Sequence, residues 1–367
     1  MTAPDPAVAP GAGPTAEDPP GLRMSALREH LGGRLPGFAP DQPVEADLLA
    51  GGRSNVTYRL TQGGRSWVLR RPPLGHVLPT AHDMAREFRV LSGLARADVP
   101  VPRVLLLCTD PAVLGVTFQV MEYVAGRTLA DAADSAGMPP AEARAVGEAA
   151  VDALLQLHAV DAVATGLGDL GRPQGYLVRQ VARWRTQWEG SRTRPVDGLD
   201  RLADWIAERA PAYTDRPWSV VHGDYRIDNL ILDPHRPAVR AIVDWEMSTL
   251  GDPIGDLALL LVYWTSTSDR LRGRVPVALG ITDGPGFPDR RAVLERYAAV
   301  RPVEEDHLRL CLALCCFKLA VVMESIAYRA AGGAYLGRDV SGMAGAAPAL
   351  IALGLAAAEG GVDALTA

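Results

Sequence analysis

Residues 220–257, which read VVHGDYRIDNLILDPHRPAVRAIVDWEMSTLGDPIGDL, constrain the fold of this chain more than any other stretch. Two apolar runs in it, residues 230–232 and 241–243, are separated by a segment rich in turn formers. This pattern predicts a tight hairpin of two short strands. The hairpin would gather three polar side chains that flank its strands: Asp224, Asn229 and Asp244.

These three side chains have the chemistry that phosphoryl transfer from ATP requires. A carboxylate takes the proton of the acceptor hydroxyl, and oxygen ligands hold magnesium on the phosphates. The sequence predicts Asp224 as the base and Asn229 and Asp244 as the metal ligands. His222 and Gly223 would shape the loop, because glycine allows an unusual backbone angle and histidine can pin a turn by hydrogen bonding.

Five motifs in this order resemble the aminoglycoside phosphotransferase superfamily of protein-kinase-like small-molecule kinases. They are Gly-Gly-Arg-Ser-Asn-Val-Thr-Tyr at 51–58, Val-Leu-Arg-Arg-Pro-Pro-Leu-Gly at 68–75, Pro-Val-Pro-Arg-Val at 100–104, His-Gly-Asp at 222–224 with Asn229, and Ile-Val-Asp-Trp at 242–245. The first three look like the branch related to the kinase domain fused to acyl-CoA dehydrogenase modules. The resemblance covers about residues 25 to 350.

The resemblance implies an α+β, bilobal protein-kinase-like fold. Residues 22–124 would form a small N-terminal lobe, an antiparallel β-sheet plus one helix, that binds the nucleotide. Residues 125–367 would form a larger, mostly helical C-terminal lobe with the catalytic loop and the acceptor pocket. Residues 1–21 are dominated by Pro, Ala, Gly and Asp and are expected to be a disordered tail without the pattern of a signal peptide.

Apolar periodicity predicts the elements of both lobes. Strands are expected at residues 47–50, 56–60 and 66–70, with two more within 101–124. Helices are expected at 22–35, 81–94, 141–158, 177–189, 199–210, 290–300, 307–330 and 346–358, and another begins at Asp256. The carboxylate of Asp256 could accept N–H bonds from the catalytic loop, whereas Asp252 is expected to cap the turn before Pro253.

The glycine-bearing turn at residues 51–55 could lie over the phosphates of the nucleotide, since glycine lets the backbone approach and direct N–H groups at them. We assign Ser54 and Asn55 to this turn, and a plain hairpin is the alternative. The resemblance also implies that residues 122–126 form the hinge, where backbone groups of Glu122 and Val124 would bind the adenine edge.

Arg70 stands where related kinases usually carry the lysine that holds the phosphates. Arginine keeps the charge and can bind phosphate oxygens in a bidentate manner. Glu87, on the helix predicted at 81–94, is the candidate carboxylate that orients Arg70. The alternative is a solvated helix charge paired with Arg86 or Arg89.

Composition limits the partners and the compartment. The net charge of −6 gives no basic field for nucleic acid or an anionic membrane, so neither is expected as a partner. Lys318, the chain's only lysine, interrupts the longest apolar run, and no membrane span is predicted. Four cysteines without zinc-site spacing favour buried, reduced thiols and a cytoplasmic setting.

The sequence thus predicts a kinase that uses ATP and Mg²⁺ to phosphorylate a hydroxyl of a small molecule, and the closest branch points to a hydroxyacyl-CoA. An antibiotic phosphotransferase for aminoglycosides or macrolides is the alternative, although no dense acidic cluster for a polycation follows Asp256. A nucleotide-binding regulatory module without turnover is an alternative of another class, supported by Arg70 in place of lysine. No sequence feature reports the oligomeric state or the choice between ATP and GTP.

Overall fold

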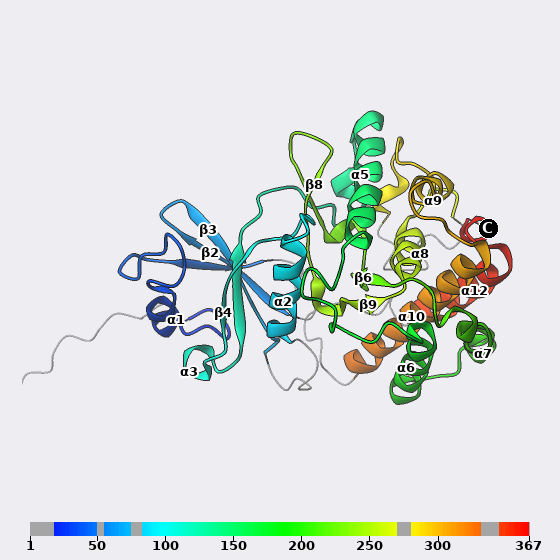
Figure 1. The fold of residues 1–367 in the computed structure, drawn as a ribbon, viewed down its shortest axis with the longest axis horizontal. Helices are drawn as coiled ribbons and strands as arrows, with labels where there is room; N and C mark the ends of the chain where they lie inside the picture. The colour runs from blue at the N-terminus through cyan, green and yellow to red at the C-terminus, as the bar shows by residue number, and fades with distance from the viewer. Residues whose placement is uncertain (1–17, 50–54, 75–82, 270–279, 332–344, 367) are drawn as a thin grey trace, which may run out of the picture. The chain divides into compact units, whose positions relative to one another are not determined.

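The computed structural model describes residues 18–49, 55–74, 83–269, 280–331 and 345–366. The chain divides into two compact units. The first comprises Met1–Ala85 and Val104–Tyr123, and the second comprises Arg86–Arg103 and Val124–Ala367. A β-sheet dominates the first unit and helices dominate the second (Figure 1). This content confirms the predicted α+β class.

The first unit is built on one five-stranded antiparallel sheet with the strand order β1-β2-β3-β5-β4. Its strands are β1 (Glu45–Leu48), β2 (Val56–Gln62), β3 (Arg65–Arg71), β4 (Val104–Cys108) and β5 (Phe118–Glu122). The short helices α1 (Met24–Leu31) and α3 (Pro111–Leu114) belong to the same unit. The predicted antiparallel sheet is therefore present.

Side chains alternate along β3, as the strand period requires. Trp67, Leu69 and Arg71 are buried on one face, while Val68 and Arg70 are half-buried on the other. The buried face belongs to a core that includes Leu27 and Leu31 of α1, Tyr58, Leu60, Phe118 and Val120. Val68 and Arg70 therefore share the less buried face of β3.

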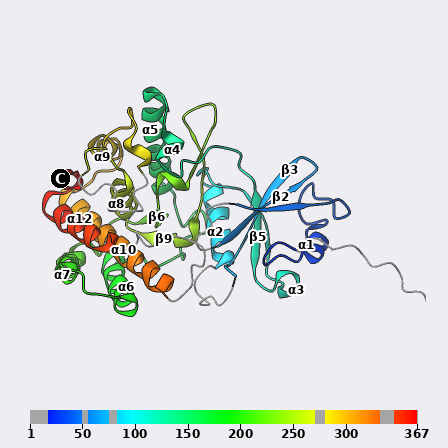
Figure 2. The same cartoon turned by 180° about the vertical axis from the view of Figure 1, so that it is seen from behind.

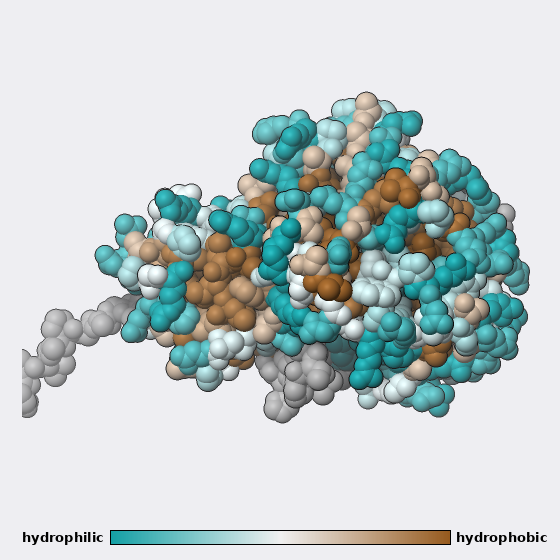
Figure 3. Space-filling model, in the orientation of Figure 1, coloured by the Kyte–Doolittle hydropathy of each residue, from teal (hydrophilic) through white to brown (hydrophobic). Residues whose placement is uncertain are grey.

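Strand β4 lies at an edge of this sheet and is apolar along its length. Residues 104–107 are half-buried, and a hydrophobic area covers this part of the first unit in Figure 3. Edge strands usually carry charges or proline that discourage pairing with other chains, and β4 carries neither.

Helix α10 (Glu305–Ala331) of the second unit packs against four other helices, α6, α7, α8 and α12. The helices of this unit are α2 (Met84–Ala95), α4 (Ala132–Ser135), α5 (Pro140–His158), α6 (Tyr176–Ser191), α7 (Leu199–Arg209), α8 (Pro253–Tyr263), α9 (Arg290–Ala298), α10 and α12 (Ala346–Gly360). In Figures 1 and 2, α12 runs alongside α10. Predicted helices occur in each of these regions apart from the short α4. Helix α8 begins earlier than expected, because Asp252 caps it and Pro253 occupies its first turn.

Helix α10 is the hydrophobic centre of the second unit. Its segment Glu305–Arg329 has a mean hydropathy of 2.1 in its most apolar window and is long enough to cross a membrane. However, 78% of that window is buried inside the protein, as is typical of a core helix. Cys311, Cys315 and Cys316 on this helix are buried free thiols. Cys108, on β4, is also buried and free, so the prediction of buried thiols is confirmed.

Helix α2 joins the second unit from Arg86 onward, although the sequence places its whole span in the first lobe. The reason is a set of contacts made by its arginines. Arg86 Nη2 donates to the carbonyl of Leu170 at 2.8 Å, and Arg89 Nη1 donates to Asp169 Oδ2 at 3.2 Å.

Two small antiparallel sheets in the second unit place the predicted functional loops. Strand β6 (Ser219–Val221) pairs with β9 (Thr249–Gly251), and β7 (Leu230–Leu232) pairs with β8 (Val239–Ile242). The β7–β8 hairpin confirms the prediction, whereas β9 was not predicted as a strand. Because Val221 at the end of β6 pairs with Thr249 at the start of β9, the loop after β6 and the loop before β9 lie at the same end of this sheet.

Candidate active site

The loop after β6 turns at His222 and Gly223. Gly223 has a φ of +80°, and a Cβ there would lie 2.6 Å from the carbonyl oxygen of Met247, so only glycine fits. His222 is fully buried, and its Nε2 donates to the carbonyl of Val243 at 2.9 Å. Its Nδ1 accepts from the N–H of Asp224 at 3.2 Å. These partners define a neutral ring protonated on Nε2, and both expectations for the turn are confirmed.

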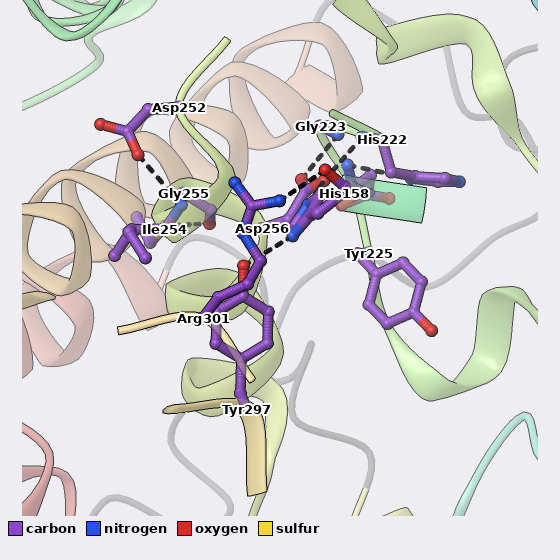
Figure 4. A network of polar contacts seen from close by, with 12 residues as sticks. His158, His222, Gly223, Tyr225, Asp252, Ile254, Gly255, Asp256, Tyr297 and Arg301 are labelled. Atoms are coloured by element: carbon purple, nitrogen blue, oxygen red, sulfur yellow. Dashed lines mark hydrogen bonds and ion pairs between the residues drawn. The ribbon is translucent and has the colours of Figure 1, made fainter. Parts of the chain in front are cut away.

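Asp256 anchors this turn from the first turn of α8, as the sequence predicts (Figure 4). Its Oδ2 accepts from the N–H of His222 at 2.6 Å, and its Oδ1 accepts from the N–H of Gly223 at 2.8 Å. Farther along the loop, the hydroxyl of Tyr225 donates to the carbonyl of Ala150 on α5 at 2.6 Å. The loop predicted to be catalytic is therefore fixed to helices α8 and α5.

A buried histidine completes the support of Asp256. His158 Nε2 lies 3.3 Å from Asp256 Oδ2, and its Nδ1 lies 2.8 Å from the hydroxyl of Tyr297. Burial lowers the pKa of His158, and the hydrogen bond to Asp256 offsets only part of this effect. Burial would raise the pKa of Asp256, but the hydrogen bonds and charge interactions with His158 and His222 outweigh burial and lower it. The lowered pKa favours an ionised Asp256.

Asp224 and Asn229 lie at the two ends of the loop and are in contact. Asn229 Nδ2 donates to the backbone carbonyl of Asp224 at 2.9 Å and lies 3.5 Å from its Oδ2. Because the amide nitrogen faces these acceptors, the amide oxygen of Asn229 points away from them. The side chain of Asp224 is 29% exposed, so a substrate can reach its carboxylate.

Asp244 is joined to the same loop through its neighbour Val243. The N–H of Val243 donates to the carbonyl of Asn229 at 2.9 Å, and its carbonyl accepts from His222. Asp244 itself has a φ of +70°, a left-handed conformation that costs a non-glycine residue about 1–3 kcal/mol. The structure thus brings the loops of Asp224, Asn229 and Asp244 together, as predicted.

The donor set suits the magnesium ion that the fold implies. Mg²⁺ is a hard cation that prefers carboxylate and amide oxygens. Asn229 offers an oriented amide oxygen, and Asp244 offers a half-buried carboxylate. These two residues fit the ion in chemical type.

The residues assigned to the nucleotide are divided between the two units. Asn55 is 2% exposed directly before β2, whereas Ser54 lies outside the described residues. Arg70 is half-buried on β3 opposite Thr57 of β2, and Glu122 is the last residue of β5. Val124 begins the second segment of the other unit.

Glu87 lies on α2 and is only 3% exposed. This burial rules out the alternative of a solvated helix charge. Arg70 belongs to the first unit and Glu87 to the second, so their pairing stays a prediction.

Sequence reasoning missed two basic residues, one within this loop and one that contacts it. Arg226 hydrogen-bonds to Asp228, lies 3.9 Å from Asp224 Oδ2 through its Nε, and stacks on the ring of Tyr263 at 4.6 Å. Burial raises the pKa of Asp228, although Arg226 beside it opposes the rise. The position of Arg226, two residues after the predicted base, was a signal that could have identified it.

Lys318 is the second missed residue. Its Nζ donates to the carbonyl of Gly223 at 2.6 Å from helix α10. A cavity of about 50 Å³ lies beside this contact, and its lining includes Tyr176, Leu177, Trp184, Met247, Leu314 and Lys318. The only lysine of a chain with 36 arginines was a signal in the composition, but nothing in the sequence indicated its partner.

Comparisons with known proteins agree with this geometry. The model of the phosphotransferase enzyme family, APH, matches residues 45–295. Acyl-CoA dehydrogenase family member 11 of Gallus gallus is 36% identical over 311 residues, a match that covers 83% of this chain and 39% of the relative. The chain therefore spans less than half the length of the curated relatives that it matches.

Solved structures show the same fold. A putative aminoglycoside phosphotransferase from Ralstonia eutropha JMP134 is 33% identical with a TM-score of 0.76, and the match covers 91% of this chain and 97% of that one. A thermostable mutant of aminoglycoside phosphotransferase APH(4)-Ia, in a ternary complex with ADP and hygromycin B, is 18% identical with a TM-score of 0.58 and matches 89% and 96% of the two chains. The second likeness shows the fold alone.

The family model covers more than half of the chain, and the catalytic loop, the hairpin and the five-stranded sheet have the predicted form. The chain therefore belongs to the phosphotransferase enzyme family and has its kinase-like α+β fold.

Proposed function

We propose that this chain is an ATP- and Mg²⁺-dependent kinase that transfers the γ-phosphoryl group to a hydroxyl of a small molecule. The observation that carries the proposal is the meeting of the loops of Asp224, Asn229 and Asp244, held by the buried anchors His222 and Asp256. Family membership supports phosphotransfer, and the residue roles are part of the proposal.

Asp224 is proposed to take the proton of the acceptor hydroxyl. Its carboxylate is reachable from solvent, and its backbone is held by His222 and Asn229. A base held in this way can align the hydroxyl for in-line attack, which is most of what phosphoryl transfer asks of the protein. Bound magnesium, held by Asn229 and Asp244, would neutralise charge on the phosphates.

The nucleotide site is proposed to use Ser54, Asn55 and Arg70 at the phosphates, with Glu87 orienting Arg70, and the backbone of Glu122 and Val124 at the adenine. The support is the family fold together with a structural neighbour that was solved with ADP. Glu87 is buried, and a buried carboxylate requires a charged or hydrogen-bonding partner, which suits the proposed pairing with Arg70.

We propose a hydroxyacyl-CoA as the acceptor. The support is that curated relatives named acyl-CoA dehydrogenase family members match most of this chain, which favours an acceptor related to acyl-CoA.

An antibiotic phosphotransferase is the second candidate. The observation that favours it is the 33% identical structure named a putative aminoglycoside phosphotransferase. An acceptor panel that includes hydroxyacyl-CoAs, sugars, aminoglycosides and macrolides separates the two candidates.

The test is ATP consumption by the wild type and Asp224→Asn across this panel, with product mass confirming a phosphorylated acceptor. We expect turnover with a hydroxyacyl-CoA and a loss in the variant of about 10²- to 10⁴-fold, the range for removal of a general base. Asp233→Asn is the matched control, because Asp233 lies in the β7–β8 turn and receives an N–H bond from His235. Its activity should equal that of the wild type.

Three outcomes would change the proposal. An Asp224→Asn enzyme with full activity would remove Asp224 from the mechanism. Turnover with an aminoglycoside or macrolide but not with hydroxyacyl-CoAs would favour the second candidate. Thermal stabilisation by ATP with magnesium, without turnover on any acceptor, would favour a regulatory nucleotide-binding module.

A further inference from the structure

Lys318 lies on the core helix α10 and forms a hydrogen bond with the catalytic loop. Its Nζ donates to the carbonyl oxygen of Gly223 at 2.6 Å. That carbonyl belongs to the peptide group that joins Gly223 to Asp224, the proposed base. Lys318 is half-buried, and its ammonium lies 5.8 Å from the ring centroid of Trp184 on α6.

The same peptide group is held at its other polar atom. The N–H of Asp224 donates to His222 Nδ1 at 3.2 Å. A peptide group is planar, so two partners at its oxygen and its nitrogen fix the orientation of the whole plane. The preceding N–H, that of Gly223, is held by Asp256. The backbone that carries the Asp224 side chain is thus fixed on both sides of Gly223.

The bond from Lys318 is the shorter of the two on this plane and the only one that carries a charge. Hydrogen bonds from a charged donor contribute more than neutral ones. No carboxylate in the described parts of the chain forms an ion pair with Lys318, and desolvating an ammonium is costly. A half-buried ammonium without an ion pair adds little to the stability of the fold, so its contact with Gly223 points to another role.

We propose that Lys318 is a positioning residue that fixes the Gly223–Asp224 peptide plane and thereby aims the Asp224 carboxylate at the acceptor hydroxyl. The inference rests on the proposed role of Asp224 as the base. Without Lys318, the plane would retain only the 3.2 Å bond to His222, and a displacement of the base of about 1 Å can cost on the order of 10²-fold in rate.

The contact itself can be tested without any activity. Because Lys318 is the only lysine, protein labelled with ¹⁵N-lysine has one side-chain ammonium signal. We expect a signal that exchanges slowly with water and differs in position from that of free lysine, and that moves in Asp224→Asn. A rapidly exchanging signal at the free-lysine position in the folded protein would overturn the proposal.

The kinetic test compares Lys318→Met with Lys318→Arg. Loss of one charge-assisted hydrogen bond predicts a kcat lower by about 30-fold in Lys318→Met, with the KM for ATP within about twofold of the wild type. Lys318→Arg should recover most of the loss, since a guanidinium N–H can donate to the same carbonyl. Arg309→Met is the control, because it removes a charge from the same helix at a site paired with Glu305.

A double variant separates positioning from a general structural effect. In the Asp224→Asn background, Lys318→Met should cause little further loss, because there is no base left to aim. An equal loss in both backgrounds, or an unchanged kcat in Lys318→Met, would refute the proposal. If Lys318→Met does not fold, the comparison of Lys318→Arg with the wild type and the ammonium signal still decide it.

The failure of this inference differs from failure of the proposed function. A wild type that phosphorylates no acceptor overturns the function, while the ammonium signal still reports whether Lys318 holds the loop. Turnover that depends on Asp224 but is indifferent to Lys318 overturns only the positioning role.

Discussion

Two buried acid–histidine pairs stand one helical turn apart at the start of α8. Asp252 Oδ2 lies 2.6 Å from His307 Nε2, and Asp256 Oδ2 lies 3.3 Å from His158 Nε2. Each histidine also contacts a tyrosine: the ring of His307 stacks on Tyr213, and His158 hydrogen-bonds to Tyr297. The two pairs are alike in residue type, burial and neighbourhood.

They differ in the backbone groups that their carboxylates hold. The other oxygen of Asp252 accepts from the N–H of Ile254 and caps its own helix. Asp256 accepts the N–H groups of His222 and Gly223, which belong to the catalytic loop. The two pairs therefore have different roles because their carboxylates bind different backbone groups. Asp252 caps a helix, whereas Asp256 supports the loop of the candidate active site.

Replacing either acid by its amide tests whether the two carboxylates have different roles, and the larger effect is expected at Asp256. In Asp256→Asn, both oxygens face backbone N–H groups, so either orientation of the amide sets an NH₂ donor against a donor. We expect a loss of about 3 kcal/mol in the free energy of unfolding and a fall in kcat of about 10²-fold or more. Chemical denaturation and steady-state kinetics measure the two effects.

The pH dependence of stability sharpens the contrast through His158. Burial lowers its pKa in the folded protein, so between that value and the unfolded value of 6.5 only the unfolded chain binds the proton. Stability due to His158 is therefore complete above about pH 6.5 and falls as the pH decreases, by at most about 1.4 kcal/mol per pH unit. The pKa of Asp256 is lowered in the folded protein, so its contribution to the free energy of unfolding would be lost only below about pH 3.8.

The measurement is the free energy of unfolding of the wild type and His158→Gln between pH 5 and 7. The variant should show a shallower slope, since the other histidines contribute equally in both proteins. Identical slopes would mean that His158 is not buried as a neutral ring.

Asp252→Asn is the matched substitution at the other pair and should have a smaller effect. Its amide oxygen can still cap Ile254, while its NH₂ group can donate to His307 Nε2 once the ring proton moves to Nδ1. We expect a loss of about 1 kcal/mol or less and a kcat within about threefold of the wild type. A loss of activity comparable to that of Asp256→Asn would place Asp252 in the support of the loop.

Sequence alone predicted what local signals encode. Turn formers between two apolar runs indicated the β7–β8 hairpin, and helical periodicity indicated nearly every helix of the second unit. The motif order indicated Asp224, Asn229 and Asp244, and the helix start indicated the separate roles of Asp252 and Asp256. In each case, the interacting groups follow a repeating pattern or a short motif.

Contacts between distant segments were not predictable in this way. Strand β9 has three residues, Thr249–Gly251, too few to show alternation, and only its pairing with β6 makes it a strand. Lys318 reaches Gly223 across 95 positions of the chain, and its own neighbours on α10 are those of any core helix.

The smallest expected effect concerns metal chelation at the Asp252 pair. Among the described residues, Asp252, His307 and Cys311 form a group whose ligand atoms lie within 4.8 Å of one another. Burial raises the pKa of the Cys311 thiol well above its usual value, which favours the neutral thiol over the thiolate that binds zinc. The 2.6 Å contact between His307 and Asp252 already satisfies both groups as a hydrogen bond. The group is therefore interpreted as packing between α8 and α10.

We accordingly expect that a chelator changes the melting temperature of the protein without nucleotide by less than about 1 °C, whereas loss of a structural zinc site would remove several kcal/mol. Cys311→Ser should be equally insensitive to the chelator. A melting temperature that falls with chelator in the wild type, is restored by zinc and no longer responds in Cys311→Ser would show a metal site. The two acid–histidine pairs would then differ in a second way, since the capping pair would bind a metal while the loop pair binds backbone.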